Sequence, residues 1–187
     1  MPGPYKSERM KPLRDSAREG RVNPKGIPCL YLADESNTAM AETRPWLASY
    51  VSLAEFKINR DLQIIDCSKP KPYYGHIFLT EPYFREPPPE EMEEAVWGEI
   101  AHAFSEPVSP TDATAEYAPT QVLAEAFRQM GSDGIRYKSL LGDGYSFVLF
   151  DLDCVDLLMR CIYETKAVQF KFEQAGNPYF VMENYSG

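Results

Sequence analysis

No uninterrupted apolar run in this 187-residue chain approaches the roughly 18 residues that a membrane-spanning helix needs. We therefore expect no membrane span, and the first residues do not follow the pattern of a secretory signal peptide. The chain also lacks a C-x-x-C pair among its cysteines, which are Cys29, Cys67, Cys154 and Cys161. Zinc sites and disulfide frameworks are thus disfavoured, and buried thiols in a reducing cytoplasm are the simplest interpretation. The sequence predicts no metal site.

Positive charge is scarce as well. The chain has 19 Lys and Arg against 28 Asp and Glu, which gives a formal net charge of −9. This balance argues against direct nucleic-acid binding, although a small anionic ligand needs only a local cation. Histidine is equally scarce, and neither His76 nor His102 has a chemical partner nearby in the sequence. We expect no catalytic role for either.

The segment from Glu86 to Glu116 contains nine acidic residues and no Lys or Arg. Within it, apolar residues recur at helical spacing after three prolines, and together they predict one buried helix face: Met92, Val96, Trp97, Ile100, Ala103 and Phe104. The acidic side of this helix is either a solvated face or a docking patch for a basic partner.

The length of the chain suits a single domain, 1–187, with a sizeable core. Its first 19 residues are rich in basic residues, proline and glycine, and we expect a loop or arm there, either solvated or placed as a lid over a site. Residues 175–187 are expected to be a loosely held tail.

Turn residues and polar chemistry coincide between Gly20 and Pro45. Glycine, asparagine and proline force a turn around Arg21, and the apolar run that follows predicts a strand, 28–33, with Tyr31 on one face. Ser36 or Asn37 can then cap a short helix, 38–44, that carries Glu42.

Further elements follow from local patterns. Two strand-like runs, 50–58 and 62–67, are separated by a polar interruption that suits a hairpin. A helix is expected over 120–130 with Gly131 as its stop, followed by strands at 134–137 and 145–150. One or more strands should follow Asp151, and the alternating stretch 168–172 is a candidate for one of them.

Several short sequence motifs of this chain occur together in one known family. The matching phrases, in order, are GRVNPKGIPCLYLA, TAMAE, YAPTQVLAE, DGIRYKS and FVLFD. In this set, spread over about residues 20 to 151, the chain resembles the RES family, named for an Arg, a Glu and a Ser. The resemblance implies an α+β, ADP-ribosyltransferase-like mixed fold: short strands in two small sheets, flanking helices and a cleft for NAD between the sheets.

The resemblance also implies a reaction, the cleavage of the bond between nicotinamide and ribose in NAD. Such a bond breaks through an oxocarbenium-like transition state, which a carboxylate such as that of Glu42 can stabilise. Arg21 is expected to pair with the pyrophosphate and Tyr31 to contact the nicotinamide end. Ser139 is expected to orient the ribose or the attacking group. NAD is then a substrate, and no other cofactor is expected.

Two departures from the family pattern bear on these roles. Members usually begin with an apolar strand bearing another arginine, whereas no such strand is visible before Lys6. A family asparagine commonly precedes the VLF strand, and Ser146 stands there in this chain. Ser146 can replace its hydrogen bond to NAD but not its donor and acceptor pair.

The biological context implied by the resemblance is a toxin that degrades NAD and is neutralised by an Xre-type antitoxin protein. Two alternatives stay open: an ADP-ribosyltransferase that modifies a protein, and a non-catalytic NAD-binding or interaction module. These motifs do not indicate which group accepts the ADP-ribosyl group, nor whether the chain forms a homo-oligomer.

Overall fold

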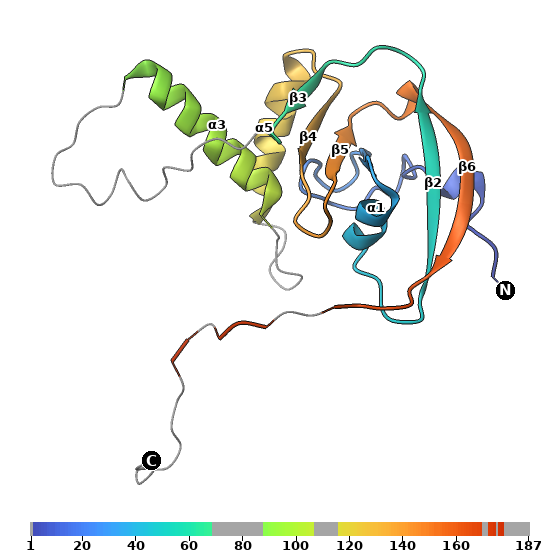
Figure 1. The fold of residues 1–187 in the computed structure, drawn as a ribbon. Coiled ribbons are helices and arrows are strands. Elements are labelled where there is room, and N and C mark those ends of the chain that lie inside the picture. Colours follow the sequence, from blue (N-terminus) through green and yellow to red (C-terminus); the bar gives the residue numbers. More distant parts are fainter. Residues whose placement is uncertain (1, 69–87, 107–115, 170–171, 175, 178–187) are drawn as a thin grey trace, which may run out of the picture.

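A computed structural model describes residues 2–68, 88–106, 116–169, 172–174, 176 and 177 of the chain (Figure 1). These residues form an α+β fold, as the sequence predicts. Its strands are β1 (Leu30–Ala33), β2 (Tyr50–Ile58), β3 (Ile64–Asp66), β4 (Gly134–Lys138), β5 (Tyr145–Leu149) and β6 (Val155–Glu164). Its helices are α1 (Ser36–Glu42), α3 (Pro89–Ser105), α5 (Ala118–Gln129) and two short 3-10 turns, η1 (Ser7–Arg9) and η2 (Leu152–Cys154).

The strands make two small sheets. The larger one has the order β1-β5-β4-β3, in which only β3 and β4 run parallel, and the smaller one is the antiparallel pair β2-β6. The predicted hairpin of 50–58 with 62–67 is therefore wrong, since β2 and β3 belong to different sheets. The reason lies in the linker: Asn59 bonds to Asp153 and Cys154, so the chain crosses to the other sheet instead of turning back.

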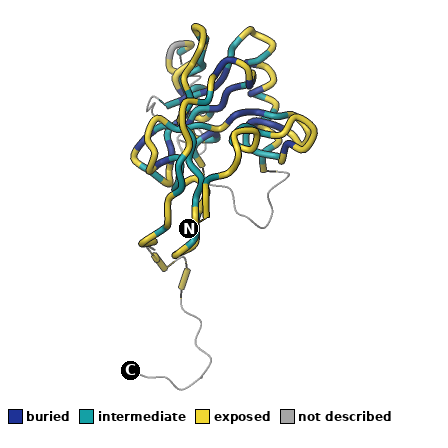
Figure 2. Tube along the Cα trace, turned by 90° about the vertical axis from the view of Figure 1, so that its right-hand side faces the viewer, coloured by how far each residue is buried: buried dark blue, intermediate teal, exposed yellow. Residues whose placement is uncertain are grey.

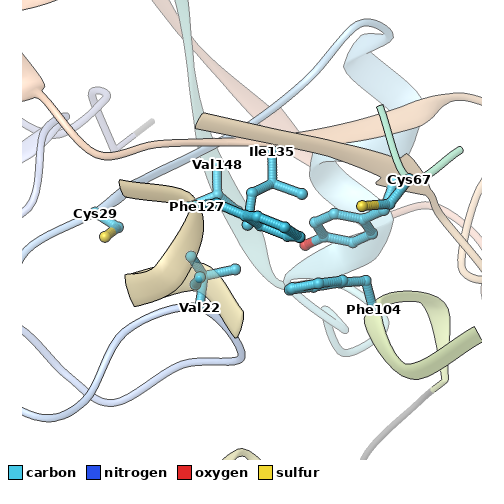
Figure 3. Packing of buried hydrophobic residues seen from close by; sticks show 9 residues of the cluster. Val22, Cys29, Cys67, Phe104, Phe127, Ile135 and Val148 are labelled. Atoms are coloured by element: carbon cyan, nitrogen blue, oxygen red, sulfur yellow. The ribbon is translucent and has the colours of Figure 1, made fainter. Parts of the chain in front are cut away.

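Each face of the larger sheet carries its own core. On one face, α3 and α5 cover a cluster that includes Phe104, Phe127, Ile135 and Val148 (Figures 1 and 3). The ring centroids of Phe104 and Tyr137 lie 6.2 Å apart in this cluster. The other face contributes Leu30 and Leu149 to a second cluster, which Val155 of β6 and Phe56 of β2 extend into the smaller sheet. The most buried segments follow these two cores (Figure 2).

The helix boundaries differ from the predicted ones by small shifts. Helix α1 starts at Ser36, and Glu35 occupies the cap position without a capping side-chain bond, so the expected cap at Ser36 or Asn37 is wrong. Helix α5 ends before Gly131, whose φ of 90° gives the left-handed stop that was predicted.

The expected apolar face of α3 is only half buried. Phe104 is fully buried, and Trp97 and Ile100 pack against the same core, whereas Met92 and Val96 are exposed. The C-terminal half of α3 therefore attaches the helix, and its first half extends beyond the sheet (Figure 1).

The N-terminal segment is an arm that is attached to the body. The Lys11 ammonium donates to the carbonyls of Leu152 and Val155 at 2.6 and 2.7 Å, and Arg14 makes a two-pronged contact with Asp153. These contacts place the middle of the arm along η2 and the start of β6.

The remaining predictions for individual segments have mixed outcomes. Strand β6 confirms that a strand follows Asp151, while residues 168, 169 and 172 lie in no strand. The remaining predictions, on His76 and on the tail, fall outside the described residues, except that 176 and 177 have no regular structure. Within the described part, no helix is long and apolar enough to cross a membrane.

Candidate functional site

The turn around Arg21 is built on Asn23. The buried Asn23 amide donates to the carbonyls of Arg18 and Ile27 at 2.9 and 2.7 Å, and its oxygen accepts the Tyr31 hydroxyl at 2.7 Å. Gly20 is needed at this place because a Cβ there would lie 2.4 Å from the Tyr31 hydroxyl oxygen. The turn and β1 are thus locked together through one tyrosine.

Tyr31 is enclosed at its hydroxyl and open along its ring. The hydroxyl accepts the backbone N–H of Val22 at 3.1 Å, while the residue as a whole is 42% exposed. Burial of the hydroxyl raises the pKa of Tyr31 well above its usual range, an effect that the Val22 N–H partly offsets. The side chain is therefore a neutral hydrogen-bonding group with an aromatic surface available for stacking.

Arg21 binds the end of α3. Its Nη1 donates to the carbonyls of Ala103 and Phe104 at 3.0 and 2.6 Å, where a helix presents unpaired carbonyls and partial negative charge. Its guanidinium carbon lies 5.9 Å from the ring centroid of Tyr137. Sequence reasoning did not foresee this structural role, which occupies one of the three guanidinium nitrogens.

Helix α1 is held against the loop that follows β4. The Thr38 hydroxyl accepts the Gly144 N–H at 3.0 Å, and the Asp34 carboxylate accepts the Tyr145 N–H at 2.8 Å. The contact is close, because a Cβ at Gly142 would lie 2.8 Å from the Cα of Thr38. This fit determines where the last residue of the helix, Glu42, is placed.

Glu42 lies against the two serines that the sequence analysis singled out. Ser139 donates to its Oε1 at 2.6 Å and Ser146 to the same oxygen at 3.3 Å. Both serines are 3% exposed, whereas Glu42 is exposed. The Ser139 oxygen also accepts the N–H of Leu141 at 3.1 Å, which fixes the direction of its proton. Neither serine bonds Oε2, so that oxygen is left for another partner.

Tyr137, which sequence reasoning did not single out, connects these groups. It is 8% exposed, and burial raises its pKa to about 12. The charge of Arg21 lowers this pKa, the charge of Glu42 raises it, and the neighbouring Ser146 hydroxyl lowers it. Arg21 and Glu42 thus act on one buried hydroxyl. The only sequence signal was its place two residues before Ser139, a spacing that puts two side chains on the same face of an extended chain.

The predicted residues are therefore assembled in two parts. Glu42, Ser139 and Ser146 are in direct contact, and Arg21 and Tyr31 border them through Tyr137 and the turn at Val22.

The groove between the two sheets does not coincide with this cluster. It has a volume of about 660 Å³ and is lined by Tyr31, but not by the other four predicted site residues. A smaller cavity of about 340 Å³ lies beside α5, lined in part by Val22, Cys29 and Arg128. The predicted NAD cleft between the sheets stays a prediction.

No group of three or more potential metal ligands lies together in the described part of the chain. All four cysteines are unpaired, and three of them are buried. Burial raises the pKa of the Cys67 thiol to about 12, so this group stays protonated at neutral pH.

Comparison with known proteins gives one match. A family model described as the RES domain matches residues 2–173, nearly the whole chain. No curated protein and no solved structure matches it.

Proposed function

Because this chain belongs to the RES domain family, we propose that it consumes NAD by cleaving the bond between nicotinamide and ribose. The observation that carries the proposal is the contact of the Glu42 carboxylate with Ser139 and Ser146. Residues from two distant parts of the sequence meet there, and a carboxylate held in one direction suits a reaction that develops positive charge.

Glu42 is assigned the central role. As the bond to nicotinamide breaks, positive charge develops on the ribose ring, and the Oε2 atom that the serines leave unused is available to stabilise it or to bind the ribose hydroxyls. Ser139 directs its proton at Glu42 and orients the carboxylate or the ribose. Ser146 adds a second, longer hydrogen bond in the position where the family commonly has asparagine.

Arg21 and Tyr31 are assigned to binding. Arg21 uses Nη1 for α3, so Nε and Nη2 are the atoms that can pair with pyrophosphate oxygens. The exposed ring of Tyr31 offers a stacking surface for the nicotinamide end. A non-catalytic NAD-binding module is the second candidate, favoured by the same engagement of Arg21 with α3.

The biological setting we propose is a toxin held in check by an Xre-type antitoxin. The exposed carboxylates of α3 offer a contact surface for such a partner: Glu91, Glu93, Glu94 and Glu99. An antitoxin pull-down that survives Glu91→Lys and Glu94→Lys together would remove α3 from that contact.

The direct test is NAD loss, followed by chromatography with purified protein in the presence and absence of phosphate. Glu42→Gln should lower the rate about 100-fold or more, as loss of a group that stabilises transition-state charge commonly does. Ser139→Ala should lower it about 10- to 100-fold, since it removes a hydrogen bond to a charged group. Glu125→Gln on α5 is the matched control and should leave the rate unchanged.

The products distinguish the alternatives. Free nicotinamide together with ADP-ribose indicates that water is the acceptor. Free nicotinamide together with a phosphate ester of ADP-ribose indicates that phosphate is the acceptor. A protein that carries ADP-ribose indicates ADP-ribosyl transfer. Intact NAD with a folded wild-type protein that still binds NAD would contradict catalysis and leave the binding module.

A further inference from the structure

The groove between the two sheets runs along strand β1, which the proposed function uses only through Tyr31. All four residues of β1, Leu30–Ala33, line it. Successive side chains of a strand point to opposite faces, so a cavity that touches four in a row meets the strand at its edge. The other walls are α1 and the smaller sheet, which contribute Ala39, Leu53 and Met159 among others.

The edge of β1 that faces the groove is unpaired. Strand β1 pairs with β5 on one side, and no other described strand pairs with it. The Asp34 N–H donates to the Tyr145 carbonyl of β5, so by alternation Leu32 and Leu30 also direct their backbone groups toward β5. The N–H and C=O groups of Tyr31 and Ala33 therefore point the other way, into the groove.

Among the described residues, the charged groups that line the groove have one sign. They are the three carboxylates of Asp34, Glu35 and Glu55, and no described Lys or Arg lines it. None of the three forms a salt bridge within the described residues. Such a wall repels the pyrophosphate of NAD and attracts a cation.

Helix α1 separates this groove from the Glu42 cluster. Residues four apart lie on the same side of a helix. Glu35 and Ala39 form one such pair and line the groove. Thr38 and Glu42 form another and contact the loop after β4. The Glu42 cluster and the groove therefore lie on different sides of one short helix, and Tyr31 is the one predicted site residue that also lines the groove.

We propose that the groove binds an extended peptide segment carrying Lys or Arg at alternate positions, which adds a strand to the free edge of β1. Main-chain hydrogen bonds to Tyr31 and Ala33 supply the pairing, and side chains on one side of the peptide meet the carboxylates. Side chains on its other side meet apolar wall residues such as Leu53 and Phe56. A second copy of this chain, paired edge to edge through β1, is disfavoured because both copies would bring the same carboxylates together.

The test uses a fluorescently labelled, end-capped peptide of four Lys-Val repeats and measures its anisotropy with the full chain. Binding should weaken with salt and fall at least tenfold for the double variant Glu35→Lys and Glu55→Lys. Glu125→Lys, on α5 and outside the groove, is the control and should not change it. A peptide N-methylated at every second residue should lose binding, because it cannot pair with β1.

Glu35 is the cap residue of α1, so Glu55→Lys alone is the second variant if the double change alters the circular dichroism spectrum. Equal binding of a Glu-Val peptide, or of the N-methylated peptide, would overturn the proposal, as would the absence of binding at millimolar peptide. A dimer that Glu55→Lys strengthens would assign the groove to a second copy instead. NAD turnover is not part of the readout, so failure here leaves the proposed function untouched.

Discussion

Tyr137 is the residue at which the separate parts of the candidate site meet. Its hydroxyl is buried beside Ser146, and the charges of Arg21 and Glu42 act on it with opposite sign. Its ring packs on Phe104, whose carbonyl holds Arg21. A side chain that belongs to the core and to the site at once passes any change in core packing on to Glu42.

The raised pKa of Tyr137 predicts an alkaline instability. The native protein holds this proton up to a pKa of about 12, whereas the unfolded chain releases it near the ordinary value of 10.0. Below pH 10 the stability is therefore fully present, and it is lost as the pH rises from 10 to 12. The contribution of Tyr137 to the free energy of unfolding in urea should fall by about 2 kcal/mol between pH 9 and 11.5, at about 1.4 kcal/mol for each unit of pKa shift.

Tyr137→Phe should remove this part of the pH dependence while the other tyrosines keep theirs. The free energy of unfolding is measured for both proteins at pH 9 and at pH 11.5, and the difference between the proteins is compared at the two pH values. A difference that stays constant across this range would contradict the assignment of the shift to burial of Tyr137.

Helix α1 is the element that decides the geometry of the site, because both of its sides are used. One side places Glu42 on the serines, and the other forms a wall of the acidic groove. The helix has only seven residues, so it depends on tertiary contacts and not on its own propensity. Its attachment through Thr38 is therefore the part most sensitive to mutation.

Thr38→Val should lower the free energy of unfolding by about 1–3 kcal/mol, because it leaves the Gly144 N–H buried without a partner. Thr38 is fully buried, and valine has nearly the same shape, so the change removes little besides the hydrogen bond. Urea unfolding measures the effect, and Thr43→Val, at an exposed position after the same helix, is the control. Equal losses in the two variants would show that the Thr38 bond contributes nothing of its own.

On the scale of the whole molecule, the two sheets are connected through the linker after β2. Arg60 in this linker donates to Asp133, which precedes β4, at 2.7 Å and to Asp151, which follows β5, at 3.4 Å. Asp133 also accepts the Gln63 N–H at 2.8 Å, just before β3. One carboxylate thus ties the crossing chain to the larger sheet.

This junction predicts an acid instability. The hydrogen bond from Arg60, followed by that from Gln63, holds the pKa of Asp133 below its ordinary value. The stability that this group contributes is therefore present above the ordinary pKa of about 3.9 and is lost as the pH falls through the lower native value. Asp133→Asn should cost about 1 kcal/mol at pH 7, a size usual for partly exposed charged hydrogen bonds.

Urea unfolding at pH 7 and at pH 2.5 checks this prediction. The gap between wild type and Asp133→Asn should narrow at the lower pH, because the unfolded chain binds the proton more readily than the native carboxyl once the pH is below the ordinary pKa. A gap that widens on acidification would contradict the lowered pKa.

The sequence by itself determined the α+β class, most of the strands and helices, and the family. Short apolar runs predicted β1, β2 and β5, and Gly131 predicted the end of α5, because such signals act between near neighbours and need no partner. The phrases that carry the resemblance also pointed to Glu42, Ser139 and Ser146, which the structure brings into contact.

Only the tertiary structure decided which strands pair and what each polar group contacts. Local pattern cannot distinguish a hairpin from a crossing linker, so β2 and β3 were wrongly joined. Arg21 at the end of α3, Tyr137 between Arg21 and Glu42, and the free edge of β1 are likewise invisible in the sequence. Each depends on segments far apart in the chain, and the packing that brings them together is a property of the whole fold.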